Sequence, residues 1–322
     1  MRVAFDVTPL AQTAAGTARH VRGLLTALDR RPDLVLEPIG FHGGGRSMSV
    51  ARDAWWYPVG LGRATRGADL LHCATFRAPG RPHTPLVVTV HDVALLLHPD
   101  AFPAWHRHTG RLALRSAARA ADAVVALSAF TRDELIELLD VPVERIRVVP
   151  NGIDSVFTTE GPAAEGDYVL AVGTLEPRKN LAAAVEAAGR AGVELRVVGA
   201  AGWGGVDVPG WVGRVSDAEL AALYRGARCL VYPSLYEGFG IPVLEAMACG
   251  TPVVTSRGGA TEEVAGGAAV LVDARDVEAV AAGIREAELR RAALVTAGVQ
   301  RARAFTWQHA ADLIENLWRE LT

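Results

Sequence analysis

The chain has 322 residues, of which 50% are hydrophobic and 21% are charged, and its formal net charge is −3. This composition supplies apolar residues for two domains of roughly 150 residues each, and it excludes a dedicated nucleic-acid binder, which needs a strongly basic surface. The three cysteines, Cys73, Cys229 and Cys249, form no CxxC pair, so we expect a cytoplasmic protein in a reducing compartment. No uncharged run reaches the ~20 residues of a membrane span, which leaves only peripheral contact with the inner face of a membrane open.

The first half of the chain alternates short apolar runs with helical patterns. The predicted strands are Val3–Val7, Leu34–Ile39, Asp69–His72, Leu86–Val90, Ala123–Leu127 and Ile146–Val149. The predicted helices are Thr17–Asp29, Pro103–Ala121 and Ala129–Leu139. Residues 43–67 show no clear pattern. The alternation predicts a parallel sheet with helices on both faces.

The alternation stops at Asn151–Asp167, which is rich in Gly, Thr, Pro and acidic residues, and we place a domain boundary there. It then resumes with the predicted strands Tyr168–Val172, Glu194–Val198, Cys229–Tyr232, Pro252–Thr255 and Ala269–Val272. The predicted helices are Leu181–Ala191, Asp217–Arg225, Ile241–Ala248 and the amphipathic segment Trp307–Leu321. The sequence therefore predicts an α/β protein with two βαβ domains, whose ligands bind beyond the carboxyl ends of the strands.

The segment from Tyr232 to Gly250 reads YPSLYEGFGIPVLEAMACG and combines a strand end, a glycine-containing loop and a helix. A helix N-terminus offers free N–H groups and a positive dipole end, so it attracts phosphate. Gly238 and Gly240 would let the backbone approach a ligand closely. This loop is therefore a candidate phosphate site, with Gly250 expected to end the helix.

Two glutamates in this segment, Glu237 and Glu245, are eight positions apart. Carboxylates would not help to bind phosphate, but they are suited to accept hydrogen bonds from hydroxyls, as on a hexose and a ribose. The alternative is that Glu237 is solvated and that Glu245 stabilises the helix start.

The stretch AVGTLEPRKNL, from Ala171 to Leu181, lies between a predicted strand and its helix. Asn180 is expected to cap that helix with its side chain. Arg178 and Lys179 precede the helix N-terminus, which is the unfavourable end for cations unless an anion bridges them. A diphosphate fits, since Arg binds oxygens bidentately and Lys provides a point charge. The alternative is a solvated basic loop.

The E-x7-E spacing within EGFGIPVLEAMACGTPVV, together with VGTLEPRKN, resembles the retaining glycosyltransferases of family 4, the group 1 glycosyltransferases. Further similar stretches are VVTVHD (Val87–Asp92), VVPNGID (Val148–Asp154), VSDAELAALYRGA (Val215–Ala227) and FTWQHAA (Phe305–Ala311). The resemblance implies the GT-B fold, in which two Rossmann-like domains face each other across a cleft. It implies an acceptor-side domain at residues 1–160, a donor domain at 161–305, and a C-terminal helix at 306–322 that crosses back to the first domain.

The resemblance also implies roles for individual residues. Glu237 would hold the donor sugar, Glu245 the ribose, and Arg178 with Lys179 the diphosphate. The residues expected to line the donor are Gly16, Thr17, Thr174, Gly238, Phe239, Gly240 and Ile241. Many family members carry an arginine at the position of Thr174, and Arg178 is the obvious substitute. No cofactor and no metal ion are expected.

His91 follows a predicted strand of the first domain, and the resemblance implies that it faces the transferred sugar. A packed or capping role is the alternative. Arg107, Arg111 and Arg115, continued by Arg119, recur every fourth residue and would form a basic stripe on one helix. This stripe is either a solvated face or a contact for an acceptor or an anionic membrane.

The resemblance implies a mannosyltransferase-like enzyme of polysaccharide biosynthesis. It would move a hexose from a GDP-mannose-like donor or a UDP- or dTDP-sugar to a hydroxyl of a glycan, lipid-linked or small-molecule acceptor, with retention. We favour departure of the diphosphate on the face that the acceptor attacks. The alternatives are a nucleotide-sugar epimerase or phosphorylase on the same scaffold, and a catalytically silent sugar-nucleotide-binding protein.

Overall fold

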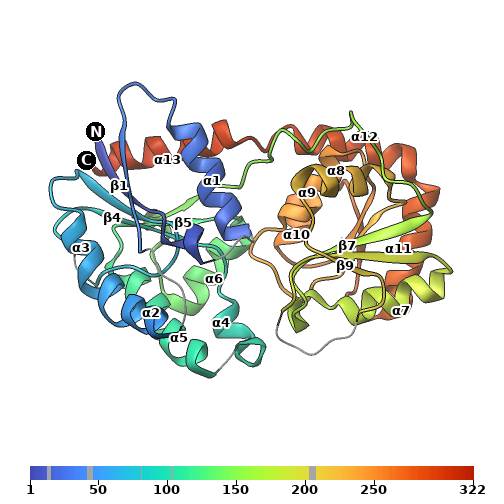
Figure 1. Cartoon of the computed structure of the whole chain (residues 1–322), viewed down its shortest axis with the longest axis horizontal. Coiled ribbons are helices and arrows are strands. Elements are labelled where there is room, and N and C mark those ends of the chain that lie inside the picture. The colour runs from blue at the N-terminus through green and yellow to red at the C-terminus, as the bar shows by residue number, and fades with distance from the viewer. Residues whose placement is uncertain (13–15, 42–45, 81, 103, 203–207) are drawn as a thin grey trace. The chain divides into compact units, whose positions relative to one another are not determined.

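The structure, a computed structural model, describes residues 1–12, 16–41, 46–80, 82–102, 104–202 and 208–322. They divide into two compact units (Figure 1). Unit 1 combines Met1–Gly152 with Thr306–Thr322, and unit 2 is the continuous segment Ile153–Phe305. The functional division at residues 160 and 305 stays a prediction.

Unit 1 is built on six parallel strands in the order β2-β1-β3-β4-β5-β6. The strands are β1 (Arg2–Asp6), β2 (Val35–Ile39), β3 (Leu70–Cys73), β4 (Leu86–Val90), β5 (Ala123–Ala126) and β6 (Ile146–Val148). The helices are α1 (Gly16–Leu28), α2 (Arg46–Ala51), α3 (Leu61–Ala64), α4 (Ala94–Leu97), α5 (Ala104–Ala120), α6 (Ala129–Leu139) and α13 (Trp307–Leu321). β3, β4 and β5 are buried along their whole length, which explains their nearly continuous apolar sequences.

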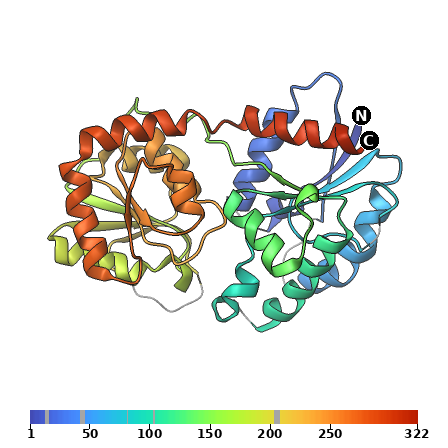
Figure 2. The ribbon, with the colours of Figure 1, turned by 180° about the vertical axis from the view of Figure 1, so that it is seen from behind.

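The C-terminal helix α13 belongs to the core of unit 1 and lies beside α1 (Figures 1 and 2). Trp318 is fully buried, its indole N–H donates to His72 Nδ1 at 3.1 Å, and its ring packs edge-on against Phe5. A Cβ at Gly23 of α1 would lie 2.1 Å from Trp307, so only glycine lets the two helices approach this closely. α13 is therefore part of the hydrophobic core rather than an appended helix.

The segment that shows no sequence pattern, residues 43–67, is largely helical in its described part. A π-helix at Arg52–Gly60 connects α2 to α3 and contains Pro58. Tyr57 is buried, whereas Trp55 is 53% exposed. A π-helix interrupted by proline follows neither the α-helical nor the strand period, which is why the sequence pattern was unreadable there.

Unit 2 contains a second parallel sheet, in the order β12-β11-β10-β7-β8-β9. The strands are β7 (Tyr168–Val172), β8 (Glu194–Val198), β9 (Trp211–Gly213), β10 (Leu230–Tyr232), β11 (Val253–Ser256) and β12 (Val270–Val272). The helices are α7 (Leu181–Ala191), α8 (Asp217–Gly226), α9 (Ile241–Ala248), α10 (Ala260–Ala265), α11 (Val277–Leu289) and α12 (Arg291–Ala302). α7 and α11 pack on one face of the sheet, and α8, α9 and α12 lie on the other (Figure 1).

Both sheets confirm the predicted fold class, two Rossmann-like α/β units with the final helix returning to the first. The edge strand β9 and the helices α10, α11 and α12 were not assigned from the sequence. Among the described residues, no helix is long and apolar enough to span a lipid bilayer.

Each sheet has one switch point, a pair of neighbouring strands from which the strand order continues in opposite directions. In unit 2 this point lies between the hydrogen-bonded neighbours β7 and β10, and in unit 1 it lies between β1 and β3. The loops that follow two such strands leave the same edge of the sheet in opposite directions, which opens a ligand-binding crevice in α/β proteins. The loops after β7 and β10 therefore occupy the expected ligand position of unit 2.

Candidate functional site

The loop after β7 is tied to the loop after β10 through main-chain and side-chain hydrogen bonds. The N–H of Leu235 donates to Arg178 O at 2.9 Å. The Asn180 side chain donates to Pro233 O at 3.2 Å and to Ala274 O at 2.7 Å. Asn180 is the N-cap residue of α7, as predicted, but its side chain makes no capping hydrogen bond to the helix. Its amide instead joins the two loops, and its own backbone adopts a left-handed conformation, with φ of 53°.

A glycine-rich turn after β8 packs directly against the backbone of the β7 loop. A Cβ at Gly199 would lie 1.8 Å from the carbonyl oxygen of Gly173, and a Cβ at Gly202 would lie 2.0 Å from that of Leu175. No side chain fits at these distances, so both glycines are required by the close approach of two backbones.

The loop after β10 ends at Gly240, whose φ of 108° turns the chain into α9. The backbone N–H groups of Phe239, Gly240 and Ile241 donate to no atom within the described part of the chain. They lie at the positive end of the α9 dipole, as the sequence predicts for a phosphate site. Gly250, with φ of 73°, follows the end of the helix as expected.

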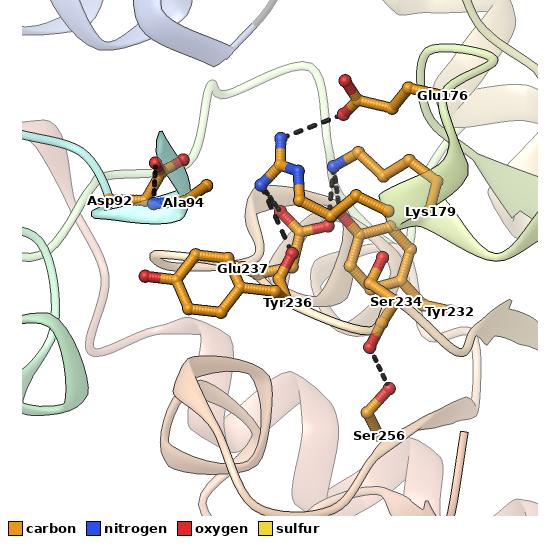
Figure 3. Close-up of polar contacts among 10 residues, drawn as sticks. Asp92, Ala94, Glu176, Lys179, Tyr232, Ser234, Tyr236, Glu237 and Ser256 are labelled. Atoms are coloured by element: carbon orange, nitrogen blue, oxygen red, sulfur yellow. Dashed lines mark hydrogen bonds and ion pairs between the residues drawn. The ribbon is translucent and has the colours of Figure 1, made fainter. Parts of the chain in front are cut away.

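Lys179, Tyr232 and Glu237 form a hydrogen-bonded triangle between the two loops (Figure 3). The Lys179 ammonium donates to Glu237 Oε1 at 2.6 Å and to the Tyr232 hydroxyl at 3.1 Å. The Tyr232 hydroxyl donates to the same Glu237 oxygen at 2.8 Å. The first carboxylate of the E-x7-E pair is therefore held against the lysine of the EPRKN segment.

Arg178 is shared between two acids, Glu176 and Glu237. Its Nη2 donates to Glu176 Oε1 at 2.9 Å, and its Nη1 lies 3.8 Å from Glu237 Oε2 and donates to Tyr236 O at 3.3 Å. The side chains of Arg178 and Glu176 are 14% and 7% exposed. The cluster thus places two cations and two carboxylates in a largely dehydrated position.

These charges control one another's ionisation. Burial opposes the charge on Glu237, but Lys179 and Arg178 outweigh it and lower the pKa of Glu237 to about 2. Burial also opposes the charge on Lys179, and the negative charge of Glu237 raises the pKa of Lys179 well above its usual value. Both groups are therefore ionised at neutral pH.

Glu245, the second carboxylate of the pair, lies on α9 and is 3% exposed. The buried hydroxyl of Tyr224, from α8, donates to Glu245 Oε2 at 3.0 Å. Burial and the charge of Glu245 raise the pKa of Tyr224 well above its usual value, so this hydroxyl stays a donor. Each glutamate of the pair is thus bonded by one tyrosine.

Comparison with known proteins accounts for both halves of the chain. A family model described as Glycosyltransferase Family 4 matches residues 14–157, and one described as glycosyl transferases group 1 matches residues 157–303. The O-antigen chain mannosyltransferase B of Escherichia coli is 30% identical over 98% of this chain and 88% of that protein. The chain is a group 1 glycosyltransferase.

Solved structures show the same GT-B fold for this glycosyltransferase. The sucrose-phosphate synthase of Thermosynechococcus elongatus superposes with a TM-score of 0.79 at 20% identity, covering 100% of this chain and 99% of that one. HepE of Anabaena, solved in complex with UDP-glucose, superposes with a TM-score of 0.75 at 18% identity, covering 100% of both chains. The mannosyltransferase-like resemblance is confirmed by the Escherichia coli relative.

In unit 1 of the glycosyltransferase, His91 follows β4 and its Nε2 donates to Ala74 O at 2.9 Å. Burial lowers the pKa of His91, so the imidazole is neutral and its Nδ1 is an acceptor. The ring of His20, from α1, packs edge-on at 5.0 Å, and His20 Nδ1 donates to Asn151 Oδ1 at 2.7 Å. The next residue, Asp92, accepts the N–H of Ala94 (Figure 3).

The remaining predicted donor residues lie at loop–helix junctions. Gly16 is the first residue of α1 and is exposed, and Thr17 is half-buried. Thr174 is half-buried in the β7 loop, where its carbonyl oxygen accepts the N–H of Glu176 at 2.7 Å. Contact of these residues with a donor stays a prediction.

The arginines of the α5 stripe differ in their surroundings. Arg111 donates to the carbonyl oxygens of Leu95 and Leu96, both within α4, at 2.9 and 3.1 Å. Arg107 pairs with Asp100 at 3.0 Å. Arg115 is exposed, so an acceptor or membrane contact of this stripe stays a prediction that depends mainly on Arg115.

Sequence reasoning did not single out Tyr232, Tyr224 or Glu176. A hydroxyl at the last position of a strand, directly before a predicted ligand loop, was the available signal for Tyr232. Lys179, which the sequence did single out, carries a compositional signal as well, because it is the only lysine in a sequence with 33 Lys and Arg residues in total. An ammonium group at one position among so many guanidinium groups indicates a site where a compact point charge is needed.

Proposed function

We propose that this glycosyltransferase transfers a hexose, with retention of configuration and without a metal ion, from a nucleoside-diphosphate sugar to a hydroxyl of a glycan, lipid-linked or small-molecule acceptor. The donor is a GDP-mannose-like sugar nucleotide or a UDP- or dTDP-sugar. The mannosyltransferase relative and the UDP-glucose complex of HepE support this class of donor. The observation that carries the proposal is the pair Arg178 and Lys179, which contact Glu237 in the loop that leads into α9, at the switch point of the unit 2 sheet.

In this proposal the diphosphate binds Arg178, Lys179 and the unbonded N–H groups at the start of α9. Glu237 accepts hydrogen bonds from sugar hydroxyls, and Glu245 accepts them from the ribose. The cations are already held by carboxylates in the ligand-free protein, so the diphosphate shares Lys179 with Glu237 rather than meeting a free charge. Preorganised charges of this kind need little rearrangement when charge develops on the leaving group.

The reaction breaks the bond between the anomeric carbon and the phosphate oxygen, and the electron pair leaves with the nucleoside diphosphate. The acceptor oxygen forms the new bond on the same face of the sugar, and its proton passes to the leaving phosphate oxygen. His91, Gly16 and Thr17 are assigned to the sugar and diphosphate in this proposal. The two cations stabilise the growing charge on the phosphate, which is the largest contribution expected from this chain.

Release of nucleoside diphosphate from a panel of GDP-, UDP- and dTDP-sugars tests the function. The wild type should act on one of them, turnover should persist in EDTA, and NMR of the product should show the donor's anomeric configuration. Lys179→Ala should reduce kcat by about 100- to 1,000-fold. Equal turnover of this variant and the wild type would refute the role of the cation, and an inverted product would refute retention.

A further inference from the structure

The Tyr232 hydroxyl is the common neighbour of the two charged groups that face each other across the β7 and β10 loops. Tyr232 is the last residue of β10 and is 3% exposed. The hydroxyl accepts a hydrogen bond from Lys179 at 3.1 Å and donates one to Glu237 at 2.8 Å. These two bonds fix the orientation of the hydroxyl group. Strand β10 lies inside the sheet, which makes this the most rigid of the three groups.

The hydrogen-bonded triangle leaves one N–H donor of the Lys179 ammonium available for a ligand. An ammonium has three N–H donors, and Tyr232 and Glu237 take two of them. In the described part of the chain, the third N–H meets no acceptor. The hydroxyl therefore sets the rotation of the ammonium and so the direction in which its remaining N–H points.

The hydroxyl can keep this role over the whole physiological pH range. Burial and the charge of Glu237 raise the pKa of Tyr232 well above its usual value. A phenylalanine at this position would keep the ring, which lies 5.5 Å from Lys179 Nζ, and would remove only the hydroxyl. Lys179 and Glu237 would then form a two-membered ion pair, free to change its geometry because both side chains are long and rotatable.

We propose that Tyr232 is a positioning residue, whose hydroxyl orients the Lys179 ammonium and the Glu237 carboxylate before the donor binds. The inference rests on the proposed function of these two residues and extends it to a group that touches neither donor nor acceptor. Tyr224 provides the contrast, because its hydroxyl bonds Glu245, which is assigned to the ribose rather than to the reacting end of the donor.

Tyr232→Phe tests the proposal, with Tyr168→Phe as the matched control. Tyr168 lies on the neighbouring strand β7, is equally buried, and loses a hydroxyl that bonds Leu223 O at 2.8 Å, outside the cluster. We expect Tyr232→Phe to lower kcat by about 10- to 100-fold with little change in the KM for the donor. Tyr168→Phe should keep the wild-type kcat, and Tyr224→Phe should mainly raise the KM for the donor.

A double-mutant cycle separates positioning from general damage. If Tyr232 acts through Glu237, then Tyr232→Phe added to Glu237→Gln should reduce kcat by much less than it does alone. Fully multiplicative losses in the double variant would overturn the proposal. A wild-type kcat in Tyr232→Phe, while Glu237→Gln is impaired, would overturn it as well and leave the proposed function intact.

The single lysine gives a readout that does not depend on turnover. Protein labelled with ¹³C,¹⁵N-lysine should show one side-chain resonance, from Lys179. Its shift should change in Tyr232→Phe but not in Tyr168→Phe, and titration with GDP or UDP should move it in the wild type. An unchanged resonance in Tyr232→Phe would overturn the positioning role. A resonance that depends on Tyr232 but responds to neither nucleotide would support that role while refuting the diphosphate site.

Discussion

A carboxylate that is at most 10% exposed lies at the switch point of each sheet, and the two have opposite surroundings. Asp6 ends β1 of unit 1, where it pairs in register with Cys73 of β3, and Glu237 follows β10 of unit 2. Asp6 accepts hydrogen bonds from the N–H and the hydroxyl of Thr8, and its Oδ2 has no partner within the described residues. Glu237 has Lys179 and Arg178 beside it.

The difference shows that neighbouring cations can reverse the effect of burial on the pKa of a carboxylate at such a position. Burial raises the pKa of Asp6 to about 6, because the bonds from Thr8 offset only part of the desolvation. Two cations bring the pKa of Glu237 to about 2 despite its burial. Unit 2 thus keeps a fixed negative charge at its switch point, and unit 1 has a group that titrates near pH 6.

The largest effect on stability is expected when Lys179 is replaced. Glu237 then loses its hydrogen-bonded cation and becomes more similar to Asp6, which has no cation partner among the residues that the structure describes. Lys179→Ala leaves the largely buried Glu237 carboxylate with Arg178 as its cation partner, at 3.8 Å. Removing one partner of a buried pair costs about 3–5 kcal/mol in the free energy of unfolding. Urea unfolding at pH 7 measures this loss. Arg228→Ala, which removes the exposed ion pairs with Asp167 and Glu288, is the control and should change stability far less.

The stability of Lys179→Ala should also depend less on acidic pH than that of the wild type. The pKa of Glu237 is lowered in the folded state, so its contribution is complete above 4.5 and is lost as the pH falls towards 2. The wild type should therefore lose stability over this range, and Lys179→Ala should lose less. Parallel curves for the two proteins would contradict the coupling of Lys179 to Glu237.

A smaller effect of the opposite sign is expected at Asp6. Its folded-state pKa is raised from 3.8 to about 6, so ionisation costs stability as the pH rises through this interval and the cost is complete above 6. The shift corresponds to about 3 kcal/mol. Asp6→Asn should therefore be more stable than the wild type at pH 7.5, with the advantage disappearing by pH 4. Denaturation at several pH values checks this, and a difference independent of pH would rule it out.

The smallest effect on stability is expected at Gly202. This position tests whether close backbone packing against the β7 loop holds the cations near Glu237. A Cβ at Gly202 would displace the carbonyl of Leu175, which should cost about 1–3 kcal/mol and shift the β7 loop away from Glu237. Gly189→Ala in α7 is the matched control, because nothing lies within 4 Å of its added Cβ, and it should be neutral or stabilising. Thermal unfolding of the two variants decides the point; similar losses in both would contradict a specific role for Gly202.

The fold was predictable where periodicity is clear and the element is buried. β4, β7 and β8 have the predicted bounds, as do α6, α7 and α9, because their apolar patterns match a sheet or a helix covered on one face. β9 was missed, since this three-residue edge strand exposes Trp211 and Val212 and carries no burial pattern. Elements at the margin of a sheet leave little signal in a sequence.

The sequence predicted which charged residues form the site, but not how they contact one another. The loop positions of Lys179 and Glu237 follow from the strand–loop–helix pattern, whereas their contact with each other and with Tyr232 depends on β7 lying beside β10. β8 and β9 intervene along the chain, so no local pattern shows this neighbour relation. For the same reason the sequence did not reveal that the Asn180 side chain bonds the opposite loop.

The return of α13 to unit 1 has a consequence for synthesis on the ribosome. Unit 2 is one uninterrupted segment, so all its strands have been translated before the last turn of unit 1 exists. Trp318, which packs against Phe5 and His72, is translated only after the whole of unit 2. Vectorial folding usually favours the N-terminal domain. In this chain the order of completion is inverted, and the nascent first unit keeps an apolar face open until the whole of unit 2 has been translated.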